Sequence, residues 1–425
     1  MKKVLGAALT AAGGRRGRKG TAIGAALLLT LPLVLSACGS KSSTGSSGAA
    51  GPATVHVLDY YNEGNDNKVI GAVLTACGQA NNLNVVRDVI PGSSLIQKVL
   101  QESSSKTLPD VLMLDNPDMQ QIAASGALTP LSNYNISTAG YAPGILQAGT
   151  YKGQIYGLAP TVNSIALFYN KDVLSKAGTT PPSTWAELRA DAKKLTVGTQ
   201  YGVALDANAT YEGSWTFLPF MWTNGGSEKE INTQQVAEAL QLWVDLIKDG
   251  SLSKGSLNWT QADAQNQFAV GKAAMMINGP WQFPALNAVK GLHYGVVPIP
   301  VNKPGQVAQA PLGGEVWTVP NTGNTQNEKN GAKIVACLND DANQVAMGVA
   351  RGTVPAKTTL APEFLKQAPT MAAFTKTVAT ARARTAILGE AWPKTATAIY
   401  TAVQQALTGG ASPADALKSA FSSLG

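Results

Sequence analysis

Histidine and cysteine are scarce in this chain. Its 425 residues include two histidines, His56 and His293, and three cysteines. His56 falls within a strand-like pattern, and Cys77 and Cys337 lie apart from both histidines. The sequence also lacks a cluster with metal-ligand spacing, a glycine-rich phosphate loop and a serine-nucleophile elbow. We therefore expect no metal site, no cofactor and no catalysis that depends on histidine or cysteine.

Charged residues are also few, at 14%, and the basic excess is confined to the N-terminus. The formal charge of +7 comes from 33 basic and 26 acidic residues, and 33 less the six basic residues near the N-terminus leaves 27. The remaining chain is nearly neutral, so no basic surface argues for nucleic acid. With 44% hydrophobic residues it is typical of a globular protein. The six basic residues are Lys2, Lys3, Arg15, Arg16, Arg18 and Lys19.

Residues 1–37 have the layout of a cleaved export signal. An apolar segment, Thr21 to Leu35, follows the basic residues and is shorter than the roughly 20 residues that span a bilayer. The box Leu35-Ser36-Ala37-Cys38 resembles the bacterial lipoprotein signal, in which the cysteine receives a diacylglyceryl and fatty-acyl (palmitate-type) anchor. The alternative is an ordinary secretory signal with a chance cysteine. Residues 38–52 are rich in glycine and serine and predict a flexible tether.

Cys77 and Cys337 remain after cleavage and, in an exported protein, could form a disulfide. Each lies in an apolar, helix-like stretch, so two buried free thiols fit the sequence equally well. The sequence leaves these alternatives open.

Strand and helix patterns alternate from residue 53 onward, which favours an α/β fold with a mainly parallel sheet. Ligands of such sheets bind beyond the carboxyl ends of the strands, where polar residues follow two of the predicted strands. The later chain is more helical, and no linker separates two lobes. Predicted strands are 55–58, 84–90, 110–114, 165–169 and 201–205; predicted helices are 67–81, 94–103, 185–195, 233–248, 261–270, 327–339 and 394–407.

Three sequence blocks carry a resemblance to a known family. The first runs from GQIYGL at 153–158 through LFYNKD at 167–172 to KAG at 176–178 and PSTW at 182–185. The second is FAVGKAAMMINGPW at 268–281, in which small and apolar residues predict a buried strand and Asn-Gly-Pro predicts a turn that places Trp281 at its end. The third is Gly313-Gly314 followed by WTVP at 317–320. In this order, the blocks resemble the extracellular solute-binding proteins of sugar ABC transporters, in the group that includes maltose-binding proteins.

The resemblance implies a two-lobed α/β fold of the periplasmic-binding-protein type, with a ligand cleft between the lobes and several hinge crossings. The first lobe would comprise residues 53–162 and 315–350, and the second residues 163–314 and 351–425. It also implies a non-enzymatic, monomeric, exported protein held at the outer face of the cytoplasmic membrane by Cys38. Its partners would be a carbohydrate and the permease subunits of an ABC importer, and the number of aromatic residues favours an oligosaccharide.

Ligand contacts are expected from aromatic and polar residues at strand ends and lobe crossings, because sugars present an apolar ring face and a rim of hydroxyls. Each has a competing structural role: a core residue for the tryptophans, a turn or solvent-exposed residue for the others. Arg351 could reach a sugar or form a salt bridge, whereas Trp185 and Trp243 are expected in the core. The expected ligand-binding residues are Tyr60, Tyr61, Glu63, Asp115, Asn116, Asn163, Trp215, Trp281, Glu315, Trp317 and Trp392.

Two other classes of function compete with solute binding. A lipid-anchored glycoside hydrolase needs two carboxylates across a glycosidic bond, and the chain supplies several carboxylates near polar turns. A surface sensor or adhesin would be expected to show repeated modules or an exposed apolar patch, and the sequence shows neither clearly.

Overall fold

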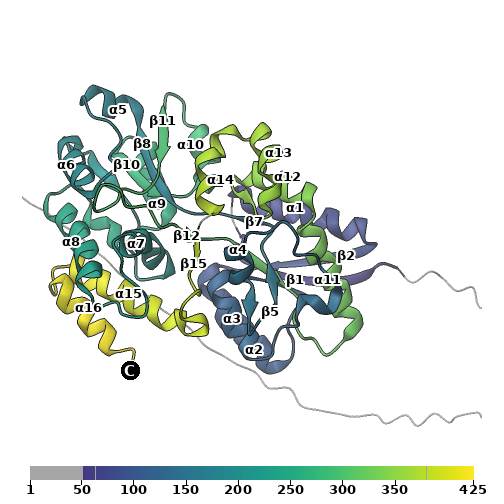
Figure 1. Cartoon of the computed structure of the whole chain (residues 1–425). Coiled ribbons are helices and arrows are strands. Elements are labelled where there is room, and N and C mark those ends of the chain that lie inside the picture. The colour runs from purple at the N-terminus through teal and green to yellow at the C-terminus, as the bar shows by residue number, and fades with distance from the viewer. Residues whose placement is uncertain (1–50, 63, 380) are drawn as a thin grey trace, which may run out of the picture. The chain divides into compact units, whose positions relative to one another are not determined.

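The computed structural model describes residues 51–62, 64–379 and 381–425, and residues 50–425 form one compact unit. The predicted signal peptide, most of the tether with Cys38, and Glu63 lie outside the described residues. Two separate β-sheets organise the described part, with helices around each of them (Figure 1). This arrangement is the expected two-lobed α/β fold.

The first sheet has five strands in the order β2-β1-β3-β13-β6. β1 pairs in parallel with β2 and β3, whereas β13 runs antiparallel to β3 and β6. The alternation of strand and helix patterns in the sequence correctly predicted the parallel pairing of β1 with β2 and β3. The sheet is nevertheless mixed, because β13 enters from a distant part of the chain in the opposite direction. The strands are β1 (Ala53–Asp59), β2 (Leu83–Val89), β3 (Val111–Asp115), β6 (Gly157–Leu158) and β13 (Glu315–Thr318).

The second sheet has four strands in the order β11-β8-β10-β9. All six residues of its inner strand β10 are buried, and all except Asn278 are apolar or small, as burial on both faces favours. β8 runs antiparallel to β10 and β11, and only β10 and β9 pair in parallel, so the expectation of a mainly parallel sheet is wrong here. The strands are β8 (Ala166–Asn170), β9 (Tyr201–Ala204), β10 (Ala273–Asn278) and β11 (Tyr294–Val297).

Short paired strands carry the chain between the two sheets. β7 pairs with β14, and β12 pairs with β15, while Asn163 and Gly313 form a bridge between two of these segments. Figure 1 shows β12 and β15 between the elements of the two sheets. The strands are β7 (Thr161–Val162), β12 (Pro311–Leu312), β14 (Val354–Pro355) and β15 (Arg382–Ala383). These crossings explain why no linker is visible in the sequence.

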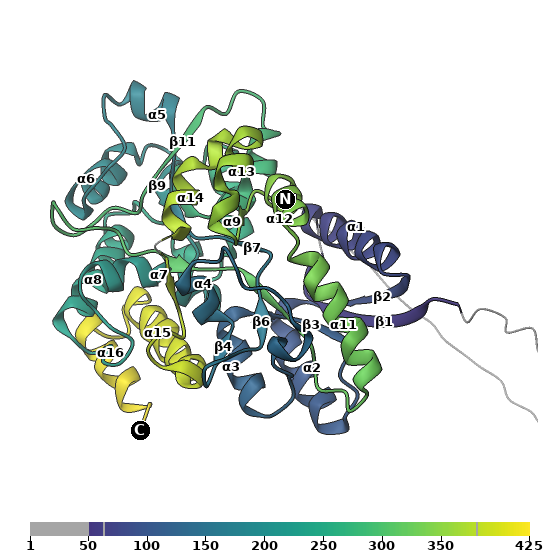
Figure 2. The same cartoon turned by 45° about the vertical axis from the view of Figure 1, so that its right-hand side comes forward.

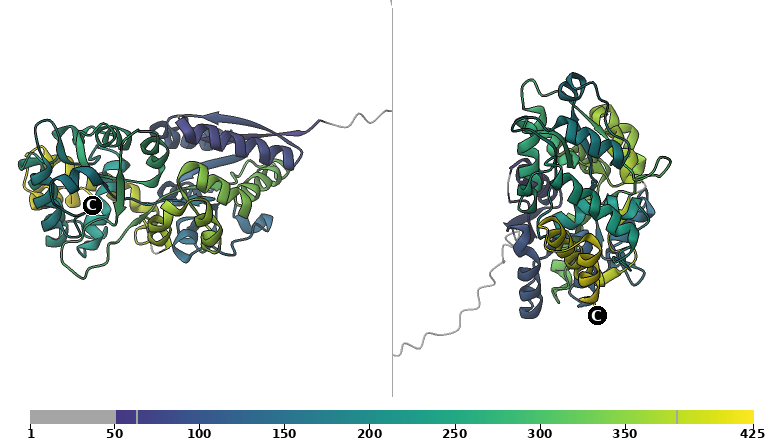
Figure 3. Two further views of the ribbon diagram at one scale, coloured as in Figure 1. Left: turned by 90° about the horizontal axis from the view of Figure 1, so that it is seen from above. Right: turned by 90° about the vertical axis from the view of Figure 1, so that its left-hand side faces the viewer.

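Helices cover both sheets. Near the first sheet, α1 packs against β2, α11 and α12 (Figure 2). Near the second sheet, α7, α8, α15 and α16 pack on one another, and Figure 3 separates these teal and yellow elements from the purple and green ones. The bounds are α1 (Gly64–Ala80), α2 (Gly92–Ser105), α3 (Asn116–Ala124), α4 (Pro143–Ala148), α5 (Lys171–Lys176), α6 (Trp185–Leu195), α7 (Tyr211–Thr223), α8 (Gln234–Lys248), α9 (Gln261–Ala269), α10 (Phe283–Asn287), α11 (Thr325–Leu338), α12 (Asp341–Arg351), α13 (Ala361–Gln367), α14 (Ala372–Ala379), α15 (Trp392–Leu407) and α16 (Pro413–Ser422).

Two large clusters of buried side chains form the interior. One surrounds the first sheet and extends through α14, whose Phe374 contacts Phe168 of β8 and Phe283 of α10. The other fills the space between the second sheet and α7, α8, α15 and α16, and it contains Trp185 and Trp243, both expected in the core. The exact lobe boundaries stay a prediction. Among the described residues, no helix combines the length and apolar character that crossing a membrane requires.

A disulfide joins Cys77 of α1 to Cys337 of α11, with their Cα atoms 5.7 Å apart. The structure therefore decides between the two alternatives that the sequence left open. The bond connects segments 260 residues apart and fixes the helix after β1 to the helix after β13.

Candidate ligand-binding site

A cavity of about 350 Å³ lies where the carboxyl ends of β1 and β3 face the N-terminus of α7 and the crossing strands. Its wall combines aromatic rings with carboxylates, guanidinium groups and amides. The lining residues are Tyr60, Tyr61, Asn62, Asp66, Asp115, Asn163, Tyr211, Glu212, Trp215, Gln261, Trp281, Gly313, Gly314, Glu315, Arg351, Thr353 and Arg384.

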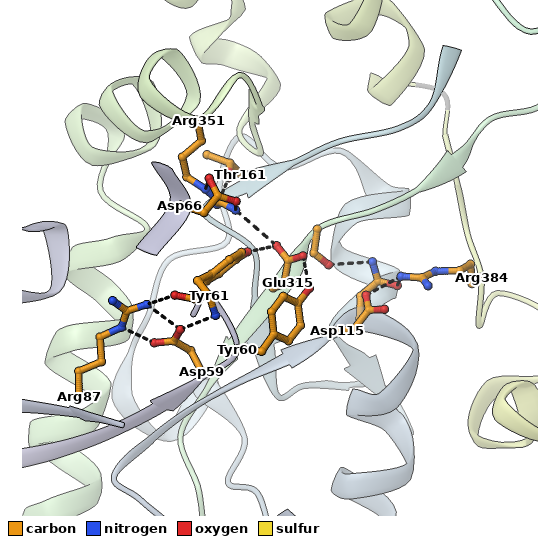
Figure 4. A network of polar contacts seen from close by, with 12 residues as sticks. Asp59, Tyr60, Tyr61, Asp66, Arg87, Asp115, Thr161, Glu315, Arg351 and Arg384 are labelled. Carbon is orange, nitrogen blue, oxygen red and sulfur yellow. Dashed lines mark hydrogen bonds and ion pairs between the residues drawn. The ribbon is translucent and has the colours of Figure 1, made fainter. Parts of the chain in front are cut away.

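Glu315 occupies the middle of the first-sheet wall. The hydroxyl of Tyr60 donates to Glu315 Oε1 at 2.5 Å, and the hydroxyl of Tyr61 donates to Oε2 (Figure 4). Burial raises the pKa of both tyrosines well above its ordinary value, so both hydroxyls stay protonated and act as donors. Burial also raises the pKa of Glu315, against the opposing effect of Arg351 and the two hydroxyls.

The backbone that carries the two tyrosines is fixed by an ion pair below it. Arg87 of β2 contacts both oxygens of Asp59, at 2.6 and 2.8 Å, and donates to the carbonyl of Tyr61 at 3.1 Å. Asp59 in turn accepts from the backbone N–H of Tyr61 at 2.9 Å. Asp59 is fully buried, and these bonds satisfy a carboxylate that would otherwise be costly to bury.

Arg351 closes one side of the site. It forms two hydrogen bonds of 3.0 Å with Asp66 and one of 3.1 Å with the hydroxyl of Thr161. Its guanidinium lies 4.4 Å from the centre of the Tyr61 ring. The salt bridge that the sequence allowed is therefore present, and a contact of Arg351 with a sugar stays a prediction.

Arg384 closes the other side. It donates to Asp115 Oδ1 at 2.5 Å, and its guanidinium lies 4.7 Å from the centre of the Trp215 ring. Trp215 is only 5% exposed. A Cβ at position 313 would overlap Asn163 and Trp215, so glycine is needed there for this packing. Gly313 thus borders the cavity and also leaves room for the side chains of Asn163 and Trp215.

Trp281 follows β10 in a short turn, as the sequence predicted, and is partly buried against the second core. Its indole folds back over Gly279, where a Cβ would overlap the ring. Glycine at 279 therefore allows the indole to take this orientation beside the cavity.

The first turns of two helices supply further polar groups. Thr210 caps α7, which places Tyr211, Glu212 and Trp215 at the cavity. Burial raises the pKa of Glu212, and a hydrogen bond of 3.1 Å from Asn208 opposes this rise. Gln261 begins α9 directly after its capping residue, Thr260.

Seven of the eleven expected ligand-binding residues line the cavity: Tyr60, Tyr61, Asp115, Asn163, Trp215, Trp281 and Glu315. They come from both sheets and from the crossings, so residues more than 200 positions apart in the sequence share one site. Their contacts with a ligand stay a prediction.

The structure places three expected residues elsewhere, and Glu63 lies outside the described residues. Trp317 is 1% exposed in the first core, because β13 pairs it with Met113 and Leu158 well inside the sheet. Trp392 is 1% exposed in the second core. Asn116 is buried and donates to the carbonyls of Leu312 and Gly314, which fixes a crossing rather than lining the cavity.

Some lining residues were not expected from the sequence. Tyr211 and Gln261 could have been found as first-turn residues that directly follow a helix cap. Asp66, Thr353 and Arg384 give no such signal, because their role arises only from contacts with distant segments.

Comparison with known proteins identifies the family. Residues 72–373 match the family model described as bacterial extracellular solute-binding protein. The chain belongs to the bacterial extracellular solute-binding proteins. Members of this family bind solutes and are not enzymes, so this solute-binding protein does not act as the glycoside hydrolase that the sequence left open.

Relatives of this solute-binding protein include named sugar-binding proteins. A maltooligosaccharide ABC transporter solute-binding lipoprotein of Streptococcus pneumoniae serotype 4 is 26% identical over 79% of this chain and 80% of the relative. A candidate binding protein of Brucella abortus (strain 2308) is 30% identical, and the match spans 51% of this chain but only 56% of that protein. Maltose-bound MalE3 of T. maritima has the same fold, with a TM-score of 0.80, 24% identity and coverage of 88% of this chain and 99% of that one.

Proposed function

We propose that this solute-binding protein captures a carbohydrate outside the cell and delivers it to the permease of an ABC importer. The observation that carries the proposal is the cavity, in which aromatic rings alternate with fixed carboxylates, amides and guanidinium groups. A sugar ring stacks on an aromatic face while its hydroxyls need donors and acceptors around the edge. The names of the Streptococcus pneumoniae and T. maritima proteins, maltooligosaccharide-binding and maltose-bound, support the same ligand class.

Capture would use closure of the two lobes. Tyr60 follows β1 and Asp115 ends β3 of the first sheet, whereas Tyr211 begins α7 and Trp281 lies after β10 of the second sheet, so one ligand can contact both sides. A ligand that binds both lobes stabilises the closed state over the open state, and only this difference in affinity shifts the equilibrium. The paired crossing strands supply the hinges, and the permease would recognise the closed state.

A thermal-shift screen of the mature protein against a carbohydrate panel tests the ligand class. A sugar at about 100 times its Kd should raise the midpoint by about 3 °C, because it binds only the folded state. Trp281→Ala should weaken binding of that sugar about 30-fold, since truncating a buried aromatic contact costs about 2 kcal/mol.

The matched control is Trp259→Ala, which removes a partly buried tryptophan of the same lobe that packs on a small separate cluster. It should leave the sugar-dependent shift intact. If no carbohydrate shifts the midpoint of the folded protein, the proposed function is wrong. A Trp281→Ala variant that loses folding stability but keeps its affinity would place Trp281 in the core instead.

We also propose that Cys38 anchors the protein at the outer face of the cytoplasmic membrane. The lipoprotein-type box at 35–38 supports this, and the Streptococcus pneumoniae relative is named a lipoprotein. Cys38→Ala should move the protein from the membrane fraction to the medium, because the anchor supplies the membrane affinity. Release can be measured by fractionation and immunoblotting, with Cys77→Ala as the control that should stay in the membrane fraction. Retention of the Cys38 variant would contradict the anchor.

A further inference from the structure

We infer that the site takes a carbohydrate of one or two sugar rings, because an arginine covers an aromatic ring on each side of the cavity. This inference rests on the proposed function and specifies the size of its ligand. It departs from the oligosaccharide suggested by the number of aromatic residues in the sequence. Each arginine is fixed by a carboxylate, and we call each trio of arginine, ring and carboxylate a cap.

The first cap consists of Arg384, Trp215 and Asp115. The guanidinium covers one face of the Trp215 indole at 4.7 Å, and the ion pair of 2.5 Å with Asp115 holds it there. Because Gly313 approaches the edge of the same ring, only 5% of Trp215 remains exposed. A sugar needs an open aromatic face for stacking, so Trp215 cannot extend the site as a further platform.

The second cap consists of Arg351, Tyr61 and Asp66. The guanidinium lies 4.4 Å from the ring centre, and two hydrogen bonds of 3.0 Å to Asp66 hold it in a planar pair. Tyr61 is 7% exposed, and its hydroxyl is engaged with Glu315. Arg351 therefore covers the Tyr61 ring, which leaves this ring unable to stack on a sugar.

The two caps bound the site on opposite sides. Figure 4 shows Arg351 above Glu315, Arg384 to its right and Tyr60 below it. The aromatic rings that remain partly exposed at the cavity are Tyr60, Tyr211 and Trp281. The cavity of about 350 Å³ is near the lower end of the range of roughly 300–1,000 Å³ for small-molecule sites. Three open rings and this volume suit a short ligand.

Arg384 offers a direct test, because the chain contains a matched trio outside the cavity. Arg382 lies 4.6 Å from the centre of the Trp222 ring and forms an ion pair of 2.7 Å with Glu228. Arg382→Ala therefore removes the same kind of contact two residues away, without opening the cavity. Arg384→Ala should expose Trp215 at the end of the site.

The experiment measures Kd by calorimetry for the wild type, Arg384→Ala and Arg382→Ala. The probes are oligomers of one to five units of α-1,4-linked glucose, β-1,4-linked glucose and β-1,4-linked mannose. In a series that binds, wild-type affinity should be highest at one or two units and about ten-fold weaker at three. In Arg384→Ala, this difference of about ten-fold should disappear, so that three units bind about as tightly as two. Arg382→Ala should keep the wild-type dependence of affinity on oligomer length.

Affinity that rises through three or more units in the wild type would overturn the size limit while leaving the proposed function intact. If the folded protein binds none of these series and no sugar of the thermal-shift panel, both the size limit and the proposed function are wrong. If Arg384→Ala does not fold, Arg384→Gln provides the same comparison with a shorter polar side chain, and an unchanged length profile in that variant would also count against the cap.

Discussion

Replacing Cys77 and Cys337 together by alanine is expected to lower the free energy of unfolding by about 2–5 kcal/mol. The disulfide links α1 to α11 across 260 residues, so its loss frees a long loop in the unfolded chain. Both helices border the first sheet, and the bond lies away from the ligand cavity. Urea unfolding followed by circular dichroism measures the change.

Reductant supplies the control. Wild-type protein with its disulfide reduced should unfold at nearly the same urea concentration as the double variant, and reductant should not change the double variant. The affinity for any sugar found in the panel should stay within about two-fold of wild type, because neither cysteine lines the cavity. Equal stability of the oxidised wild type and the double variant would contradict a stabilising bond.

Asp118→Asn is expected to stabilise the protein by about 4 kcal/mol at pH 8 and by much less at pH 4. Burial, with a smaller effect from the charge of Asp115 and against that of Arg384, raises the pKa of Asp118 from 3.8 to about 7. The unfolded chain loses this proton near pH 4 while the folded state keeps it, so wild-type stability falls as pH rises. Three pKa units correspond to about 4 kcal/mol, and the loss is complete above pH 7.

Asp415→Asn is the matched control for this pH dependence. Both aspartates occupy the third position of a helix, Asp118 in α3 and Asp415 in α16, but Asp415 is exposed. Its replacement should not stabilise the protein at any pH, because Asp415 belongs to the cap of its helix and accepts a hydrogen bond from Ser412. Unfolding measured from pH 4 to pH 8 tests both variants. A constant difference between Asp118→Asn and wild type across this range would show that Asp118 is charged when buried.

The sequence predicted those helices and strands of the fold whose local patterns were strong. The helix at 185–195 was predicted with the bounds that the structure gives, and the structure shows that Thr184 and Glu187 form a capping box at its start. The strand before Asn278 was predicted because an unbroken apolar run fits a central strand buried on both faces. Strand direction was not predictable in the same way, because β13 reaches the first sheet through pairing with segments far away in the sequence.

The residues of the candidate site show the same difference between local patterns, which the sequence reveals, and long-range pairing, which it does not. Tyr60 and Asp115 could be proposed because polar or aromatic residues directly follow two predicted strands, and such ends meet at one edge of a parallel sheet. Trp281 could be proposed because it follows the Asn-Gly-Pro turn in a block that resembles solute-binding proteins. Trp317 was expected at a lobe crossing, but its pairing with Met113 places it in the core. A short sequence pattern does not reveal how deep a strand residue lies.

The sequence alone predicted an α/β protein with an export signal, nearly neutral after loss of its basic leader, that resembles solute-binding proteins, because charge, leader layout and ordered motifs are properties of the linear chain. Only the tertiary structure decided that Cys77 meets Cys337, and that Arg351 and Arg384 cover Tyr61 and Trp215. These contacts join residues separated by more than 150 positions. They depend on how the sheets and crossing strands pack, and no local pattern records that packing.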